Sequence, residues 1–177
     1  MARFFFLCTA MIAALGTSPA LCAPQGLLDK TVTMSWSTSG SGTRADGTAV
    51  SFSNINTRVV YISTAGRTFL RMEVKSSGRR GAARSADKGP GEGSSKGSVR
   101  LDGNRLVGTE AFASGARQYV ATFDPGFSSC TLSVIDAKSG GAKISRRGPD
   151  GTMYVIDSVS TGSPTCSVRS GNAFSGN

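Results

Sequence analysis

Residues 31–37 read Thr-Val-Thr-Met-Ser-Trp-Ser, so small polar and apolar side chains alternate along the segment. Successive side chains of a β-strand point to opposite faces of a sheet, and this alternation predicts a strand with one buried and one solvated face, with Trp36 in the core. The same two-residue period returns at 70–75, 119–123 and 130–134. Because no segment after the N-terminal one shows a sustained 3.6-residue apolar stripe, we expect an all-β protein with little or no helix.

Glycine-containing turns separate the strand-like segments. They are Asp-Gly at 46–47, Ala-Gly at 65–66, Asp-Gly-Asn at 102–104, Gly-Gly at 140–141 and Asp-Gly at 150–151. Glycine supplies the positive φ that tight hairpin turns need, and Asp or Asn tolerates the left-handed region beside it. Short turns between neighbouring strands predict an antiparallel meander.

We expect eight to ten strands in this meander. They are predicted at about 30–38, 48–54, 57–63, 67–75, 97–102, 105–112, 116–124, 129–137, 152–160 and 165–169. One open sheet of so many strands would leave exposed edges. We therefore favour a single antiparallel meander closed as a small β-barrel, with a β-sandwich as the alternative.

The first 23 residues have the three parts of a secretory signal peptide. Arg3 provides the positive start, 4–15 are mostly apolar, and small residues precede Ala23. The apolar run is shorter than the ~20 residues of a membrane-spanning helix, so we expect no transmembrane segment after processing. Cleavage after Ala23, with Ala20 and Cys22 as alternatives, leaves one domain at 24–177 in the periplasm or outside the cell. The net charge falls from +9 to +8, because only Arg3 is lost.

Export leaves one pair of cysteines. Cys8 and Cys22 lie in the signal peptide, so Cys130 and Cys166 are the pair that remains. In an oxidising compartment two thiols have one possible connectivity, and we expect a disulfide. It closes a loop of about 37 residues and, in the chain-entropy model, contributes about 4 kcal/mol.

The chain has no histidine, which narrows the possible chemistry. Ser-His-Asp and Cys-His catalysis and histidine zinc sites are excluded. We predict no catalytic residues, no metal and no cofactor, and we favour a binding protein over an enzyme. A hydrolase using paired carboxylates stays open, with Asp124, Asp136 and Asp157 as the acids in or beside strands. Alternation with Met153 and Val155 would point Asp157 inward.

Residues 76–98 contain no large apolar side chain and are rich in Gly, Ser and basic residues. A segment with nothing to bury cannot offset the entropy of ordering, so we expect a flexible basic loop there. Its charge predicts contact with polyanions, either an anionic envelope polymer or lipid headgroups, and not with nucleic acid. A solvated loop that only aids solubility is the alternative. The candidate polyanion-binding residues are Arg79, Arg80, Arg84, Lys88, Lys96 and Arg100.

Two stretches, 115–130 and 150–168, resemble small exported β-domain proteins of soil and root-associated alphaproteobacteria. The resemblance implies no activity, but it implies that both cysteines belong to one domain. We hypothesise an exported, non-enzymatic β-barrel that binds a small apolar ligand or an anionic envelope component. The alternatives are the carboxylate hydrolase and a structural or inhibitory interaction domain. The oligomeric state is open.

Overall fold

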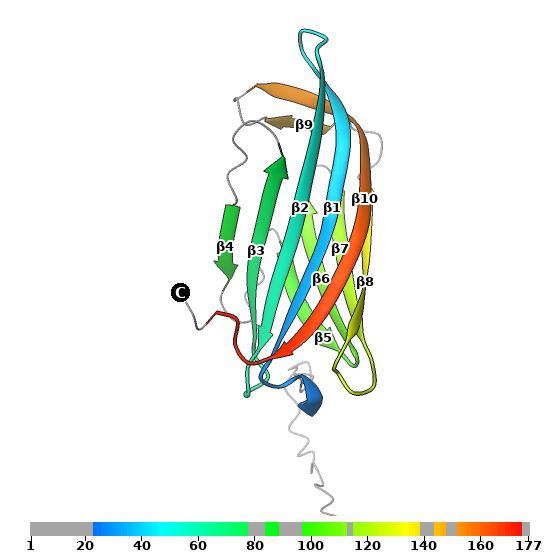
Figure 1. The fold of residues 1–177 in the computed structure, drawn as a ribbon. Coiled ribbons are helices and arrows are strands. Elements are labelled where there is room, and N and C mark those ends of the chain that lie inside the picture. Colours follow the sequence, from blue (N-terminus) through cyan, green and yellow to red (C-terminus); the bar gives the residue numbers. More distant parts are fainter. Residues whose placement is uncertain are drawn as a thin grey trace, which may run out of the picture.

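The computed structural model describes residues 23–77, 84–88, 97–112, 115–138, 144–147 and 152–174. Within these ranges the chain is all-β, as predicted, and the one helical element is the short 3-10 turn η1 (Gln25–Leu27) (Figure 1). No helix in them is long and apolar enough to span a membrane. The strands are β1 (Lys30–Arg44), β2 (Ala49–Ile62), β3 (Thr68–Ser77), β4 (Arg84–Lys88), β5 (Gly97–Asp102), β6 (Arg105–Phe112), β7 (Gly115–Phe123), β8 (Cys130–Lys138), β9 (Ile144–Arg147) and β10 (Met153–Ser170).

The strands form two antiparallel sheets. One has the order β4-β3-β2-β1-β10-β9 and the other the order β5-β6-β7-β8. Neither sheet closes on itself, so the favoured barrel is not confirmed and the arrangement is consistent with the sandwich alternative. Two short strands that the sequence did not indicate give the physical reason. β4 pairs with β3 at 70–74, and β9 pairs with β10 at 153–156. These short strands occupy the strand edges that would have to pair with the smaller sheet to close a barrel.

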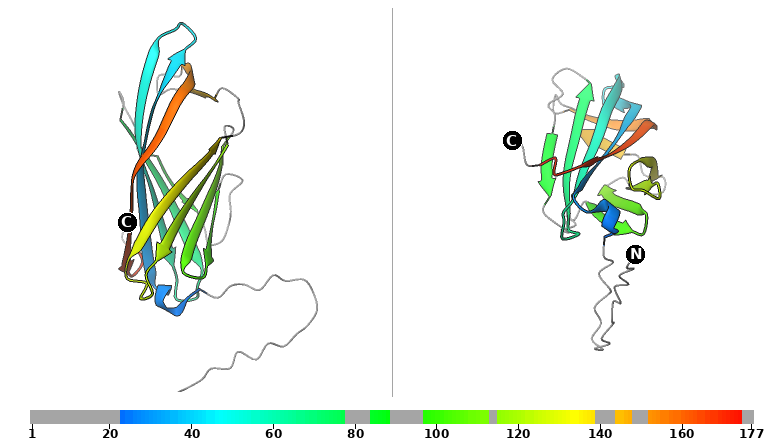
Figure 2. Two further views of the ribbon diagram at one scale, coloured as in Figure 1. Left: turned by 90° about the vertical axis from the view of Figure 1, so that its right-hand side faces the viewer. Right: turned by 60° about the horizontal axis from the view of Figure 1, so that its bottom comes forward.

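Three long strands dominate the larger sheet. The predicted strands 48–54 and 57–63 are one strand, β2, and those at 152–160 and 165–169 are one strand, β10. Both pair with β1, with irregular register against β10 between Ser35 and Ser37 and between Ser41 and Gly42. The β1–β2 hairpin extends beyond the smaller sheet, and the sheets meet near η1 and spread apart toward the hairpin (Figure 2).

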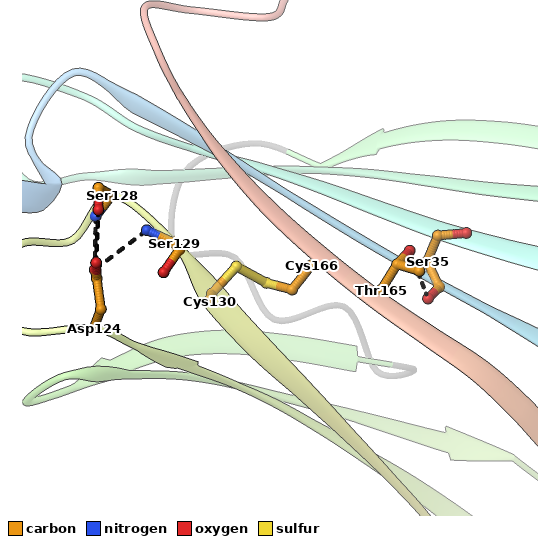
Figure 3. The surroundings of a disulfide bond; sticks show 7 residues. All are labelled: Ser35, Asp124, Ser128, Ser129, Cys130, Thr165 and Cys166. Carbon is orange, nitrogen blue, oxygen red and sulfur yellow. Dashed lines mark hydrogen bonds between the residues drawn. A yellow bond between two sulfur atoms is a disulfide. The ribbon is translucent and has the colours of Figure 1, made fainter.

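The apolar core fills the end where the sheets meet. Inward-facing side chains from β1, β2, β6 and β7 are fully or almost fully buried there, as the two-residue period predicts. They include Val32, Met34, Val60, Ile62, Leu106, Ala121 and Phe123. The predicted disulfide between Cys130 and Cys166 is confirmed, with Cα atoms 5.5 Å apart, and it joins β8 to β10 across the two sheets (Figure 3).

Residues 76–98 are more structured than a single loop wherever the structure describes them. β3 continues to Ser77, β4 pairs with β3, and β5 begins at Gly97. Pairing of this kind comes from backbone hydrogen bonds, which need no apolar side chain, and an argument from side-chain burial therefore overlooks it. The remaining positions of 76–98 lie outside the described residues.

Candidate functional site

Four charged side chains occupy inward positions just beyond the apolar core. Arg58 follows the inward alternation of β2, Glu110 that of β6, Arg117 that of β7 and Asp136 that of β8. Arg58 and Glu110 are each 2% exposed, and Arg117 is also buried. We refer to Arg58, Glu110, Arg117 and Asp136 as the charged band. It lies where the two sheets begin to separate.

The first ion pair of the charged band links the two sheets. Arg58 Nε donates to Glu110 Oε1 at 2.5 Å and Arg58 Nη2 donates to Glu110 Oε2 at 3.0 Å. The remaining guanidinium nitrogen donates to the backbone oxygens of Thr57 and Glu73. A buried charge is tolerated when it is paired and its other hydrogen-bonding atoms are satisfied, and this geometry meets both conditions.

The second ion pair joins neighbouring strands of the smaller sheet, and a hydrogen bond to its carboxylate reaches the larger sheet. Arg117 Nε donates to Asp136 Oδ1 at 2.6 Å, and Arg117 Nη2 to Oδ2 at 3.3 Å. Thr161 Oγ1 on β10 donates to Asp136 Oδ2 at 2.8 Å. The Arg58–Glu110 pair therefore connects β2 to β6, and the Thr161–Asp136 hydrogen bond connects β10 to β8. Side chains of the charged band therefore join the sheets where no backbone ladder does.

Two aromatic rings separate the charged band from the core. The guanidinium carbons of Arg58 and Arg117 lie 5.1 and 5.5 Å from the Trp36 ring centroid, and the Trp36 and Tyr119 centroids are 5.5 Å apart. Gly108, opposite Tyr119 on β6, has no side chain, and a Cβ there would overlap the Tyr119 ring. Burial, reinforced by the charge of Glu110, raises the pKa of the Tyr119 phenol well above its ordinary value.

A partly enclosed hollow of about 230 Å³ extends from the charged band toward the β1–β2 hairpin. Along β2 its lining runs from Arg58 through Asn56 and Asn54 to Phe52. Thr38 and Val159 contribute from the neighbouring strands of the same sheet. The full lining is Thr38, Phe52, Asn54, Asn56, Arg58, Met72, Val74, Glu110, Arg117 and Val159. The hollow thus combines apolar side chains with amides and the charged band.

Among the predicted polyanion-binding residues, Arg100 is the one whose side chain the structure describes, and it is not part of the lining of this hollow. Arg100 is exposed on β5, and its Nη1 lies 3.7 Å from Asp102 Oδ2. Arg84 and Lys88 belong to β4, the edge strand of the larger sheet. The other candidates, Arg79, Arg80 and Lys96, lie outside the described residues. Polyanion binding stays a prediction.

The three acids of the carboxylate hypothesis do not face one cleft. Asp124 accepts hydrogen bonds from Ser128 and from the Ser129 backbone in the turn after β7 (Figure 3). Asp136 belongs to the charged band. The inward orientation expected for Asp157 is wrong: it is exposed and accepts a hydrogen bond from Thr43 Oγ1 at 2.7 Å. Asp157 lies near the start of β10 at a register irregularity, where Ser158 pairs with Ser41 and Ile156 with Gly42, so Asp157 itself has no partner in the β1 ladder.

Sequence reasoning missed the residues that form the site. Arg58, Glu110 and Arg117 were not singled out from the sequence, although each falls on the buried side of its strand. Arg58 is two residues before Val60, and Arg117 is two residues before Tyr119. The sequence signal that could have identified them is a charged residue two positions from an apolar residue on the buried face of the same strand.

Comparison with protein-family models, with curated proteins and with solved structures finds no match for this chain. The resemblance of 115–130 and 150–168 to exported alphaproteobacterial proteins therefore stays a prediction. Among the residues that the structure describes, no group of three or more His, Cys, Asp or Glu side chains is placed to hold a metal ion. The geometry of the hollow is what bears on function.

Proposed function

We propose that this protein is an exported, non-enzymatic binding protein that takes a small molecule into the hollow between its two sheets. The observation that carries the proposal is the charged band bordering that hollow. Well-packed apolar residues would often stabilise a sheet interface as well as a buried ion pair does, or better. A buried pair, Arg58–Glu110, with a partly exposed second pair beside an open space is therefore better explained by recognition than by stability.

The contents of the hollow favour binding over hydrolysis. Glycosidase-type chemistry needs one carboxyl that donates a proton and a second that acts as base or nucleophile. Glu110 and Asp136, the inward-facing acids of the charged band, are each held by both nitrogens of an arginine fork. Both oxygens of such a carboxylate already accept hydrogen bonds from the arginine. This arrangement suits the carboxylate to holding the arginine side chain in place.

The size of the hollow favours a small ligand. Its volume of about 230 Å³ is below the ~300–1,000 Å³ of sites for drug-sized molecules. The disulfide between Cys130 and Cys166 supports the exported location, because such bonds persist in oxidising compartments.

The proposal is tested by mapping backbone amide shifts of the isotope-labelled protein against a library of small polar and apolar molecules. Saturable shifts that cluster on inward positions of β1, β2 and β7 are expected for at least one compound class. Shifts confined to the outer faces of the sheets, or no saturable shift with any compound, would reject a binding hollow.

A further inference from the structure

The charged band carries no net charge. Arg58 is neutralised by Glu110 and Arg117 by Asp136. An anionic ligand would have to draw an arginine away from its carboxylate, and a cationic ligand would have to draw a carboxylate away from its arginine. Either exchange leaves one protein charge poorly compensated, and Arg58, Glu110 and Arg117 are buried with little access to water. The hollow therefore favours an uncharged ligand.

The hollow also presents hydrogen-bonding groups that an apolar ligand would leave unsatisfied. Asn56 Nδ2 donates to Thr38 Oγ1 at 3.0 Å, and within the described part of the chain its side-chain oxygen makes no hydrogen bond. The Asn54 amide has no hydrogen-bond partner among the described residues and is half-buried. Covering these groups with hydrocarbon would remove their water without replacement. An uncharged ligand that fits must itself carry donors and acceptors.

One aromatic ring lines the same space, and a second lies beside it. Phe52 lines the hollow, and its ring centroid lies 6.3 Å from that of Tyr154. Both rings lie over glycines of β1: a Cβ on Gly40 would be 2.5 Å from Phe52 Cζ, and one on Gly42 would be 2.8 Å from Tyr154 Cδ2. Both aromatic side chains are half-buried, so part of each ring stays accessible. The two glycines thus make room for an aromatic surface beside the amides.

A sugar ring matches these three features together. It is uncharged, its hydroxyl groups donate and accept hydrogen bonds to planar amides, and its C–H face packs on aromatic rings. We infer that the ligand of the hollow is one neutral sugar unit, free or at the end of a longer glycan. The inference rests on the proposed binding function and names its ligand class.

The test compares ligands that share a ring and differ in charge. Methyl glucoside, methyl galactoside and N-acetylglucosamine are titrated against the labelled protein beside glucuronate, glucosamine and hexanol. At least one neutral sugar is expected to shift the amides around Phe52 and Asn54 saturably, with at least tenfold weaker binding of the charged analogues. A matching trisaccharide that binds more tightly than the monosaccharide identifies a glycan end as the source, and equal affinity identifies the free sugar.

Variants of β2 locate the binding. Phe52→Ala and Asn54→Ala are each expected to weaken sugar binding at least tenfold, with Phe52→Leu as a milder second variant. Ile55→Ala is the matched control, because Ile55 is the next residue on the strand, points to the opposite face and is 52% exposed. Its sugar affinity should be unchanged.

The outcomes separate the two levels of the argument. If hexanol or a charged analogue shifts the same amides and no neutral sugar does, the sugar inference is overturned. The proposed binding function is then still supported. Sugar affinity that is insensitive to both inward variants would also overturn the inference. If no compound of any class shifts inward residues, the proposed function fails with it.

Discussion

Replacing Glu110 by Gln tests whether the charged band depends on charge compensation. The side chain keeps its shape but no longer neutralises Arg58, whose guanidinium is held 2.5 and 3.0 Å from the carboxylate oxygens in a pair that is 2% exposed. Removing one partner of a buried ion pair costs about 3–5 kcal/mol. Domains of this kind have ~5–15 kcal/mol of stability in total, so the loss should be large but measurable.

Urea unfolding followed by fluorescence is a suitable assay, since Trp36 is the only tryptophan of the chain and packs against the band. Asp102→Asn is the matched control. It breaks the Arg100–Asp102 pair, whose side chains are 64% and 49% exposed, and should change the unfolding free energy by less than about 1 kcal/mol. The double variant Arg58→Met, Glu110→Leu should recover much of the loss, because no unpaired charge remains. A Glu110→Gln cost no larger than that of Asp102→Asn would refute the reasoning.

Four further predictions concern the rest of the molecule. Reducing the β8–β10 disulfide should lower the unfolding free energy by about 4 kcal/mol on the chain-entropy model, and an unchanged urea midpoint would contradict it. Gly108→Ala should cost about 1–3 kcal/mol by driving a methyl group into the Tyr119 ring, whereas Gly126→Ala, whose nearest neighbours are 3.9 Å away, should stay within about 0.5 kcal/mol in the same assay. Because the pKa of Tyr119 is raised in the folded state, that state keeps a proton which the unfolded chain loses near pH 10, so stability is present below that pH and falls as the pH rises above it. The loss of unfolding free energy above pH 10 should be smaller in Tyr119→Phe. Identical pH profiles of the two proteins would contradict this role of Tyr119. Replacing the five basic residues of 76–98 by Ser should abolish salt-sensitive retention on an anionic matrix if that segment binds polyanions, and undiminished retention would reject that prediction.

The strands could be read from the sequence because one face of each is buried. Residues 31–37 alternate without interruption, and β1 begins at Lys30, where the pattern starts. The closure of the sheet could not be read in this way. β4 and β9 are short edge strands held by backbone pairing, and backbone hydrogen bonds leave no trace in an apolar pattern.

The disulfide was predictable by counting, because the other two cysteines lie in the predicted signal peptide and only Cys130 and Cys166 lie after it. The charged band was harder to see, because Glu110 lies opposite Arg117 on a neighbouring strand but bonds to Arg58 in the other sheet. That partnership depends on how the two sheets pack, and the period within one strand carries no information on it. Asp157 shows a related limit, because alternation within one strand does not reveal a register irregularity against the neighbouring strand.

A crystal structure of the protein grown with a saturating methyl glycoside tests the central claim most directly. We expect ring-shaped density in the hollow between Phe52 and the Asn54 and Asn56 amides, with both ion pairs of the charged band intact. A hollow containing only ordered water, or one closed by its own side chains, would contradict the account.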